Sequence, residues 1–178
     1  MILAIDDLMS WGCENDIKRI NLLTDDGERP TVKGTNIRVI YSDSAKVKVQ
    51  IMAPTYEQYP NAERPYMEFP DGMQVYFYDD SLQMESEITS EYAIYYIEER
   101  LWHATGNVVA RHFVDGDALY TEELFWNENE KRIYSDSYTK VHNEENVLYG
   151  SRGFRANQDF SNWQLIGSSG TIIVEDEE

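Results

Sequence analysis

The sequence predicts an all-β protein that folds as one antiparallel domain of the sandwich, roll or barrel kind. Three observations predict this class. Apolar and polar residues alternate over short stretches, turn signals recur every eight to twelve residues or so, and residues that favour pleated surfaces are common, 13 of them tyrosines. A chain of 178 residues fits one domain and can bury a core without disulfides. We therefore expect a leader over residues 1–30, a β-domain over 31–174 and an acidic tail over 175–178.

The first half of that domain is predicted to hold short strands separated by turns. Lys46–Ile51 alternates strictly, which is typical of a half-buried strand, and Pro70-Asp71-Gly72 is a turn signal. Residues 82–97 contain no glycine or proline, so a helix is the alternative there. Their tyrosine and β-branched content instead favours two strands with a bend near Ser90-Glu91. Ala53–Pro65 has three prolines and predicts an irregular loop. The other expected strands are Thr35–Ile40, Met67–Phe69 and Gln74–Tyr78.

The second half continues the pattern, and after residue 130 it does so in pieces of about four to seven residues. Polar or glycine-containing turns are expected at Thr105-Gly106-Asn107, Asp115-Gly116-Asp117 and Asn127–Glu130. Ala118-Leu119-Tyr120 and Val147-Leu148-Tyr149 form a weak internal repeat, which stacked hairpin units would leave. The expected strands are Leu101–His103, Val108–Ala110, Ala118–Trp126, Ile133–Ser135, Lys140–His142, Asn146–Tyr149, a piece at Phe154, Trp163–Ile166 and Thr171–Val174.

The charge of the chain excludes several classes of partner. There are 33 acidic and 15 basic residues, a formal charge of −18. Nucleic acid and an anionic membrane surface both require clustered Lys and Arg, so neither is an expected ligand. Cys13 is the one cysteine, which rules out an intramolecular disulfide. No apolar run is long enough, at about 18 residues, for a single membrane-spanning helix.

The residue types of catalytic and metal sites are present but not in productive spacing. Two of the three histidines flank Gly106-Asn107 and could face each other across a hairpin near Asp115 or Asp117, yet tight zinc-ligand spacing is missing. Asp115-Gly116-Asp117 begins like a calcium loop without the later ligands. Glu98-Glu99 and Glu122-Glu123 are strand neighbours that point to opposite faces, unlike a glycosidase pair. We expect no metal, no cofactor and no enzyme activity. The histidines are His103, His112 and His142.

The N-terminal segment offers one modification site. Gly12-Cys13 after an apolar stretch resembles the end of a bacterial lipoprotein signal, in which the cysteine is lipidated. Asp6 and Asp7 interrupt that stretch, Trp11 is a poor fit before the cysteine, and no basic region precedes it. A frayed N-terminus with a free cysteine is therefore the alternative to a lipid anchor.

An ordered set of motifs in Leu82–Ile166 resembles the LptC family of lipopolysaccharide export proteins, within the wider OstA-like family. Gly116–Trp126 is similar to the pattern G-x-x-L-x-T-E-x-L-x-W, and Leu101–Val108 to L-x-G-N-V. Ile133–Asp136 with Val141 looks like I-x-S-D followed by V. The remaining two pieces, with one extra residue between the glycines of the second, are Ile88–Tyr95 and Gly150–Ala156.

This resemblance implies a twisted, boat-like antiparallel β-roll, or jelly roll, with open edge strands on the periplasmic side of the inner membrane. It implies a carrier that receives lipopolysaccharide from an inner-membrane ABC transporter complex of the LptB, LptF and LptG type. The carrier then hands it to an LptA-like bridge protein through its edge strands. Family members usually have one N-terminal membrane helix, which this sequence lacks. That departure favours Cys13 as the tether.

The alternation of the strands indicates which residues would bind lipid, with ordinary core packing as the alternative for each. The candidates for the inward, acyl-binding face are Val108, Leu119, Leu124, Trp126, Ile133, Val141, Leu148, Phe154 and Trp163. Arginines can hold phosphates in bidentate contacts, and the candidates for a phosphate-binding rim are Arg100, Arg111, Arg132, Arg152 and Arg155. Four glycines are expected at turns or bulges, namely Gly106, Gly116, Gly150 and Gly153.

Two other functions stay open at this point. The chain could be the soluble, LptA-like bridge component itself. From a different class, it could be an extracellular sugar-binding or adhesive β-sandwich, in which Tyr and Trp side chains would form an exposed stacking platform. An enzyme would require two carboxylates that converge across a cleft.

Overall fold

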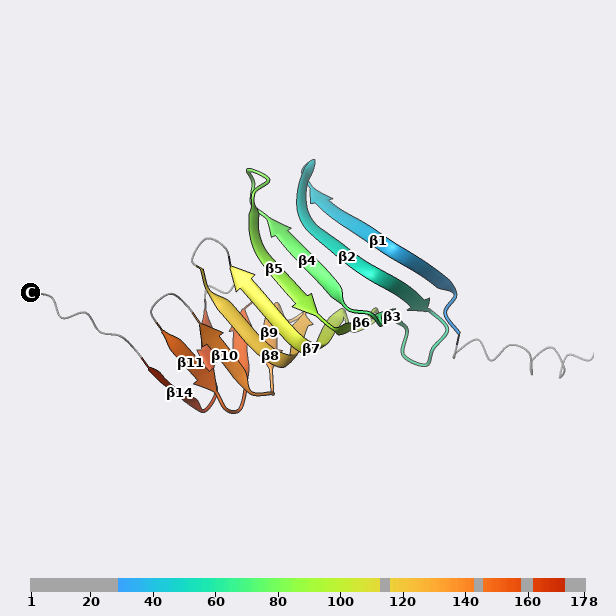
Figure 1. The fold of residues 1–178 in the computed structure, drawn as a ribbon. Coiled ribbons are helices and arrows are strands. Elements are labelled where there is room, and N and C mark those ends of the chain that lie inside the picture. The colour runs from blue at the N-terminus through green and yellow to red at the C-terminus, as the bar shows by residue number, and fades with distance from the viewer. Residues whose placement is uncertain (1–28, 113–115, 143–145, 158–161, 172–178) are drawn as a thin grey trace, which may run out of the picture.

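A computed structural model describes residues 29–112, 116–142, 146–157 and 162–171, which form one antiparallel sheet of fourteen strands. This confirms the predicted all-β fold. Cys13, almost all of the leader and the acidic tail lie outside the described residues, so their predicted roles stay predictions. Among the described residues, none forms a helix that could span a membrane. Figure 1 shows the strands in a long twisted array from β1 to β14.

The strand bounds agree with the predicted pattern over most of the chain. The strands are β1 (Val32–Asp43), β2 (Lys46–Tyr59), β3 (Tyr66–Phe69), β4 (Met73–Tyr78), β5 (Met84–Ser90), β6 (Tyr92–Tyr96), β7 (Leu101–His112), β8 (Ala118–Asn127), β9 (Arg132–Ser135), β10 (Thr139–His142), β11 (Val147–Gly150), β12 (Phe154–Asn157), β13 (Trp163–Leu165) and β14 (Ser168–Thr171).

Three long strands hold the sheet in two facing layers, because each changes its partner partway along. β2 pairs with β4 and then with β3, and β7 pairs with β6 and then with β5. β8 pairs with β10 through residues 118–121 and with β9 through residues 125–127. The first layer therefore contains β4, β5, β10, β11 and β14, and the second layer contains β3, β6, β9, β12 and β13.

The short strands come in consecutive pairs that cross between the layers at a corner. Gly72 separates β3 from β4, and Gly153 separates β11 from β12. Gly153 has a φ of 105°, and a Cβ there would lie 2.0 Å from the carbonyl oxygen of Ser135, so no other residue fits. The predicted bend at Ser90-Glu91 is another of these corners, between β5 and β6.

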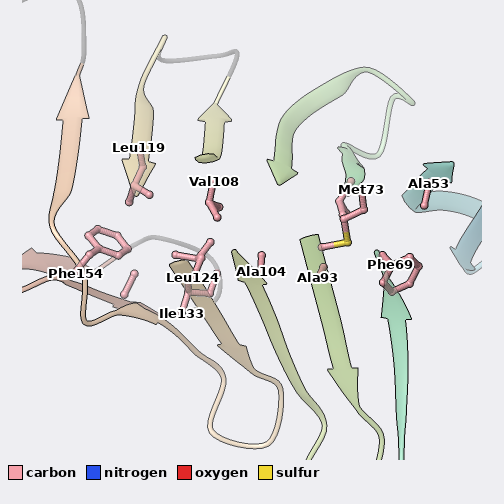
Figure 2. Packing of buried hydrophobic residues seen from close by; sticks show 12 residues of the cluster. Ala53, Phe69, Met73, Ala93, Ala104, Val108, Leu119, Leu124, Ile133 and Phe154 are labelled. Atoms are coloured by element: carbon pink, nitrogen blue, oxygen red, sulfur yellow. The ribbon is translucent and has the colours of Figure 1, made fainter. Parts of the chain in front are cut away.

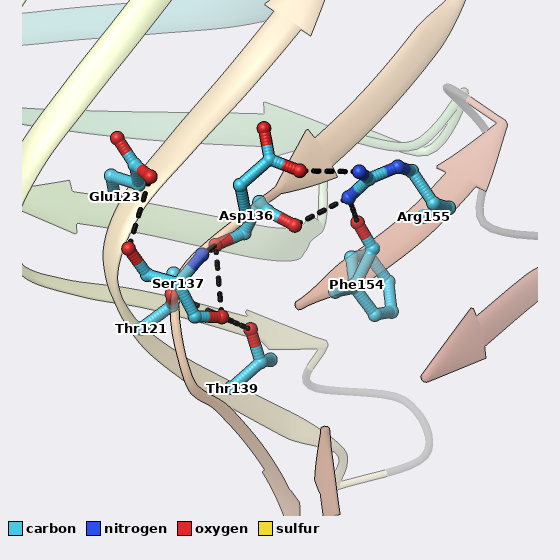
Figure 3. Close-up of polar contacts among 8 residues, drawn as sticks. Thr121, Glu123, Asp136, Ser137, Thr139, Phe154 and Arg155 are labelled. Atoms are coloured by element: carbon cyan, nitrogen blue, oxygen red, sulfur yellow. Dashed lines mark hydrogen bonds and ion pairs between the residues drawn. The ribbon is translucent and has the colours of Figure 1, made fainter. Parts of the chain in front are cut away.

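Hydroxyl side chains stabilise the corner between β9 and β10 (Figure 3). Ser135 Oγ lies 2.9 Å from Thr121 Oγ1 and accepts the backbone N–H of Ser137 at 3.1 Å. Ser135 and Thr139 are fully buried, so these bonds supply partners that water cannot. Arg155 donates to the carboxylate of Asp136 from the neighbouring strand β12.

The core lies between the two layers. Figure 2 shows side chains from both layers pointing toward one another, with Met73 and Phe69 in one part and Leu119 and Phe154 in the other. In strands such as β4 and β12 the buried residues alternate with more exposed ones, as period-two patterning requires. The layers are therefore held together mainly by apolar burial, at about 25 cal/mol per Å² removed from water.

Three details of the predicted secondary structure were wrong. The predicted loop Ala53–Pro65 is a loop only from residue 60 onward, because β2 continues through Pro54 to Tyr59. Gly106-Asn107 is not a hairpin turn but a bulge inside β7, where the register with β8 shifts. The last strand is Ser168–Thr171 and therefore begins three residues earlier than the predicted strand over 171–174.

Pro54 is tolerated because it sits where β2 passes between partners. Residues 49–52 of β2 pair with β4 and residues 57–59 pair with β3, so Pro54 lies between the two ladders. The pairing of β2 with the edge strand β1 also passes over Pro54, since the register goes from Thr35, opposite Thr55, to Ile37, opposite Ala53. The missing N–H of proline therefore breaks no regular ladder bond.

Candidate functional site

A groove of about 610 Å³ lies between the two layers in the half of the molecule that contains β7 to β13. Its volume is within the range of about 300–1,000 Å³ that ligand sites occupy. The first layer lines it with Phe77, Ile88, Ala110, Leu119 and Val141. The second layer lines it with Leu124, Trp126, Ile133, Phe154 and Trp163.

Strand register brings these side chains together. Ala110 of β7 is opposite Leu119 of β8, and Leu119 is in turn opposite Val141 of β10. Side chains directly opposite each other in a sheet share one face, so the three form a continuous apolar row. Leu148 of β11 is the next member of the row, opposite Val141. The internal repeat predicted from sequence thus places Leu119 and Leu148 on the two sides of the same residue.

Seven of the nine residues predicted for the inward face line the groove, namely Leu119, Leu124, Trp126, Ile133, Val141, Phe154 and Trp163. Val108 is fully buried in the core beside it. Leu148 lines a smaller cavity of about 380 Å³ together with Trp163. Whether these residues bind acyl chains stays a prediction, but the structure gives them a shared apolar space.

The charged residues that line the groove all come from the strand ends farthest from the corners. Glu85 and Glu87 are near the start of β5, Arg111 and His112 end β7, and Asp117 precedes β8. Arg111 Nη1 lies 3.4 Å from Glu87 Oε2, and His112 Nε2 lies 3.8 Å from Glu85 Oε1. The groove therefore has an apolar floor and a charged mouth on its first-layer side.

The five predicted rim arginines do not gather in one place. Only Arg111 lines the groove. Arg100 lies just before β7 and pairs with Glu128 at 2.8 Å. Arg132 lies in β9 and pairs with Glu130 at 3.3 Å. The hydrogen bond that Arg100 donates to the Glu128 carboxylate raises the pKa of Arg100. The remaining two, Arg152 and Arg155, lie at or next to the corner before β12.

The histidines and acidic pairs form no convergent centre. His103 and His112 belong to the same strand β7, so the prediction that they face each other across a hairpin was wrong. His103 stacks on Phe125 with ring centroids 4.0 Å apart, and its Nε2 lies 3.4 Å from Glu123 Oε2. Within the described ranges, no group of three or more His, Cys, Asp or Glu residues could hold a metal ion.

The contribution of β4 and β5 to the groove was not predicted from the sequence. Phe77 and Ile88 line the groove from β4 and β5, although the inward candidates came only from later strands. The signal was available in the alternation of Gln74–Tyr78, which puts Val75 and Phe77 on the same face. Trp102 and Trp126 pack toward the interior, so these two tryptophans would not contribute to the exposed Tyr and Trp platform of a sugar-binding sandwich.

One comparison with known proteins gives a match. A family model described as lipopolysaccharide-assembly, LptC-related, matches residues 3–173. The match covers the groove and all fourteen strands. No curated protein matches the chain.

Proposed function

Because this chain belongs to the LptC-related family of lipopolysaccharide-assembly proteins, we propose that it carries lipopolysaccharide by holding the acyl chains in the interlayer groove. The family implies a role in lipopolysaccharide transport and is a transport family, not an enzyme family. The observation that carries the proposal is an apolar space of about 610 Å³ that remains open inside a folded sheet. Each methylene moved from water into such a space contributes about 0.8 kcal/mol.

We further propose that the carrier receives lipopolysaccharide from an inner-membrane ABC extractor complex and passes it to an LptA-like bridge protein. Both contacts would use strand addition at the ends of the sheet. Among the strands that the structure describes, β1 pairs with β2 alone and β13 and β14 each pair with one strand, so both ends present edges open to strand addition. On β1, Val39, Ile40 and Tyr41 are exposed apolar side chains that a partner strand could cover.

We propose a location on the periplasmic side of the inner membrane, with the leader as the tether and Cys13 as the anchor. We expect the Cys13→Ala variant to be lost from the membrane fraction, and that result would support this arrangement. Unchanged membrane association of that variant would exclude lipidation at Cys13 as the tether.

Photocrosslinking tests the acyl-binding role directly. A photoreactive phenylalanine is placed at Leu119 or Leu124, which line the groove, and at their outward-facing neighbours Tyr120 and Phe125 on the same strand. We expect lipopolysaccharide adducts at the two inner positions in the presence of the extractor complex, and few at the two outer positions. Equal adducts at all four would mean that lipid does not use the groove. With the photoreactive residue at position 119, the additional Leu124→Asp substitution should abolish the adduct.

A further inference from the structure

The mouth of the groove is more acidic than a site for a phosphate group should be. Three carboxylates and one guanidinium line it, contributed by Glu85, Glu87, Asp117 and Arg111. Counting His112 as neutral, the formal charge of the lining is −2. The second-layer side of the same groove is lined by apolar residues alone. A headgroup that follows its acyl chains into the groove therefore meets the acidic first-layer side.

The guanidinium of Arg111 is already engaged. It lies 3.4 Å from Glu87, whose side chain is only 16% exposed, so releasing Arg111 would leave a half-buried carboxylate without that cation. His112 is similarly close to a carboxylate, at 3.8 Å from Glu85. A phosphate at the mouth would have to compete with both carboxylates for these two side chains.

Three of the other four arginines of this half are held elsewhere by acids. Arg100 pairs with Glu128, Arg132 with Glu130 and Arg155 with Asp136. None of them lines the groove. Charge effects at the mouth are stronger than in open water, because the apolar floor has a low dielectric constant. An unmasked phosphate is therefore disfavoured there, and a positive group beside the phosphate is favoured.

From this charge distribution, and resting on the proposed function, we propose that the groove selects amphiphiles whose phosphates carry a covalently attached amine. The ammonium group would lie against Glu85 and Asp117 at the mouth while the acyl chains fill the apolar floor. An organic ammonium fits better than a bridging divalent ion, since no three His, Cys, Asp or Glu side chains of the described residues, those of the mouth included, are placed so that they could hold a metal ion together. Burial of the acyl chains provides the binding free energy, and the carboxylates at the mouth determine which headgroup is preferred.

The test compares two synthetic amphiphiles with identical acyl chains, one with free phosphates and the other with each phosphate esterified to 2-aminoethanol. Both are titrated in neutral detergent micelles containing EDTA, with the full chain, and binding is followed by the fluorescence of the groove tryptophans. We expect the amine-bearing form to bind about fivefold more tightly, as two or three partly exposed charge contacts would produce. The Glu85→Gln/Asp117→Asn variant should lose this preference and still bind both forms.

The matched control is the Glu98→Gln/Glu122→Gln variant, which removes two exposed carboxylates that do not line the groove. It should keep the preference. Equal affinity of the two amphiphiles for the unmodified chain would overturn the inference, as would a preference that survives Glu85→Gln/Asp117→Asn. Tighter binding of the phosphate form in excess MgCl₂ than of the amine form would replace the ammonium with a bridging metal ion. Binding of neither amphiphile would instead contradict the proposed function.

Discussion

The interior of the sheet has a filled half and an open half, although both follow the same alternating pattern. In the filled half, between β2 and the start of β7, the ring centroids of Phe69 and Trp102 are 6.0 Å apart and those of Tyr95 and Trp102 are 4.5 Å apart. In the open half, around the groove, Phe154 and Trp163 have centroids 6.2 Å apart but border about 610 Å³ of space. Alternation therefore assigns side chains to a face without determining whether the layers close over them.

The difference in packing between the two halves assigns them different roles, one in the stability of the fold and the other in ligand binding. Dense packing in the filled half provides dispersion contacts and excludes water, whereas the groove gives up those contacts along its lining. We conclude that the filled half maintains the two-layer fold and the open half is free to accept a ligand. Substitutions in the filled half should then mainly lower stability, and substitutions in the open half should affect stability less and lipid binding more.

The largest expected difference is between two tryptophans that are cross-strand partners, Trp102 of β7 and Trp126 of β8. Trp102→Ala should lower the free energy of unfolding by about 3–5 kcal/mol, because it empties a packed aromatic cluster. Trp126→Ala should cost about half as much, since it enlarges a space that already exists. Urea denaturation measures both. Equal losses would contradict the division of the interior into two halves.

The next prediction adds volume instead of removing it. Ala93 has no exposed surface and sits in the core cluster, so Ala93→Phe should destabilise the chain by about 1–3 kcal/mol through overpacking. Ala110 lines the groove, so Ala110→Phe should change stability by less than about 0.5 kcal/mol. Ala110→Phe should nevertheless reduce lipopolysaccharide crosslinking at Leu119, its cross-strand partner. A groove variant as unstable as Ala93→Phe would show that the space is not free to be filled.

Much of the inward face could be predicted because it depends on short-range order. Within Ala118–Trp126, alternation places Leu119 with Thr121 on one face and Leu124 with Trp126 on the other, so it predicts each pair but not that both pairs point inward. The repeat of Ala118–Tyr120 at Val147–Tyr149 anticipated their symmetric pairing with β10. These features need only the local sequence and the geometry of a strand.

The rest depends on contacts between distant segments. That β2 passes through Pro54 follows from the partner change between β4 and β3, which no local signal reveals. The ion pairs of the arginines also join distant residues, such as Arg100 with Glu128 and Arg111 with Glu87. The alternation of a strand predicts the face on which such an arginine lies, but it does not predict that the arginine is already paired with a carboxylate. The volume of the groove likewise depends on how far apart the layers lie.

The smallest expected effect concerns the polar atom of the same two tryptophans. Trp102 Nε1 donates to Glu128 Oε1 at 3.0 Å, whereas Trp126 Nε1 is buried without a hydrogen-bond partner. A buried donor without a partner costs about 1–3 kcal/mol, and replacing it with an apolar group removes that cost. Phenylalanine lacks the indole N–H and keeps most of the apolar ring.

Trp126→Phe should therefore leave stability unchanged or raise it by up to about 1 kcal/mol, while Trp102→Phe should lower it by about 1 kcal/mol. Urea denaturation of the two variants and of the double variant measures both effects and their coupling. A clear loss of stability in Trp126→Phe would mean that the indole of Trp126 is held by a polar contact or by tight packing. In that case the wall of the open half would be as closely packed as the interior of the filled half. Retained stability in Trp126→Phe would instead show that the groove wall tolerates a smaller ring, as a surface that must adapt to a ligand should.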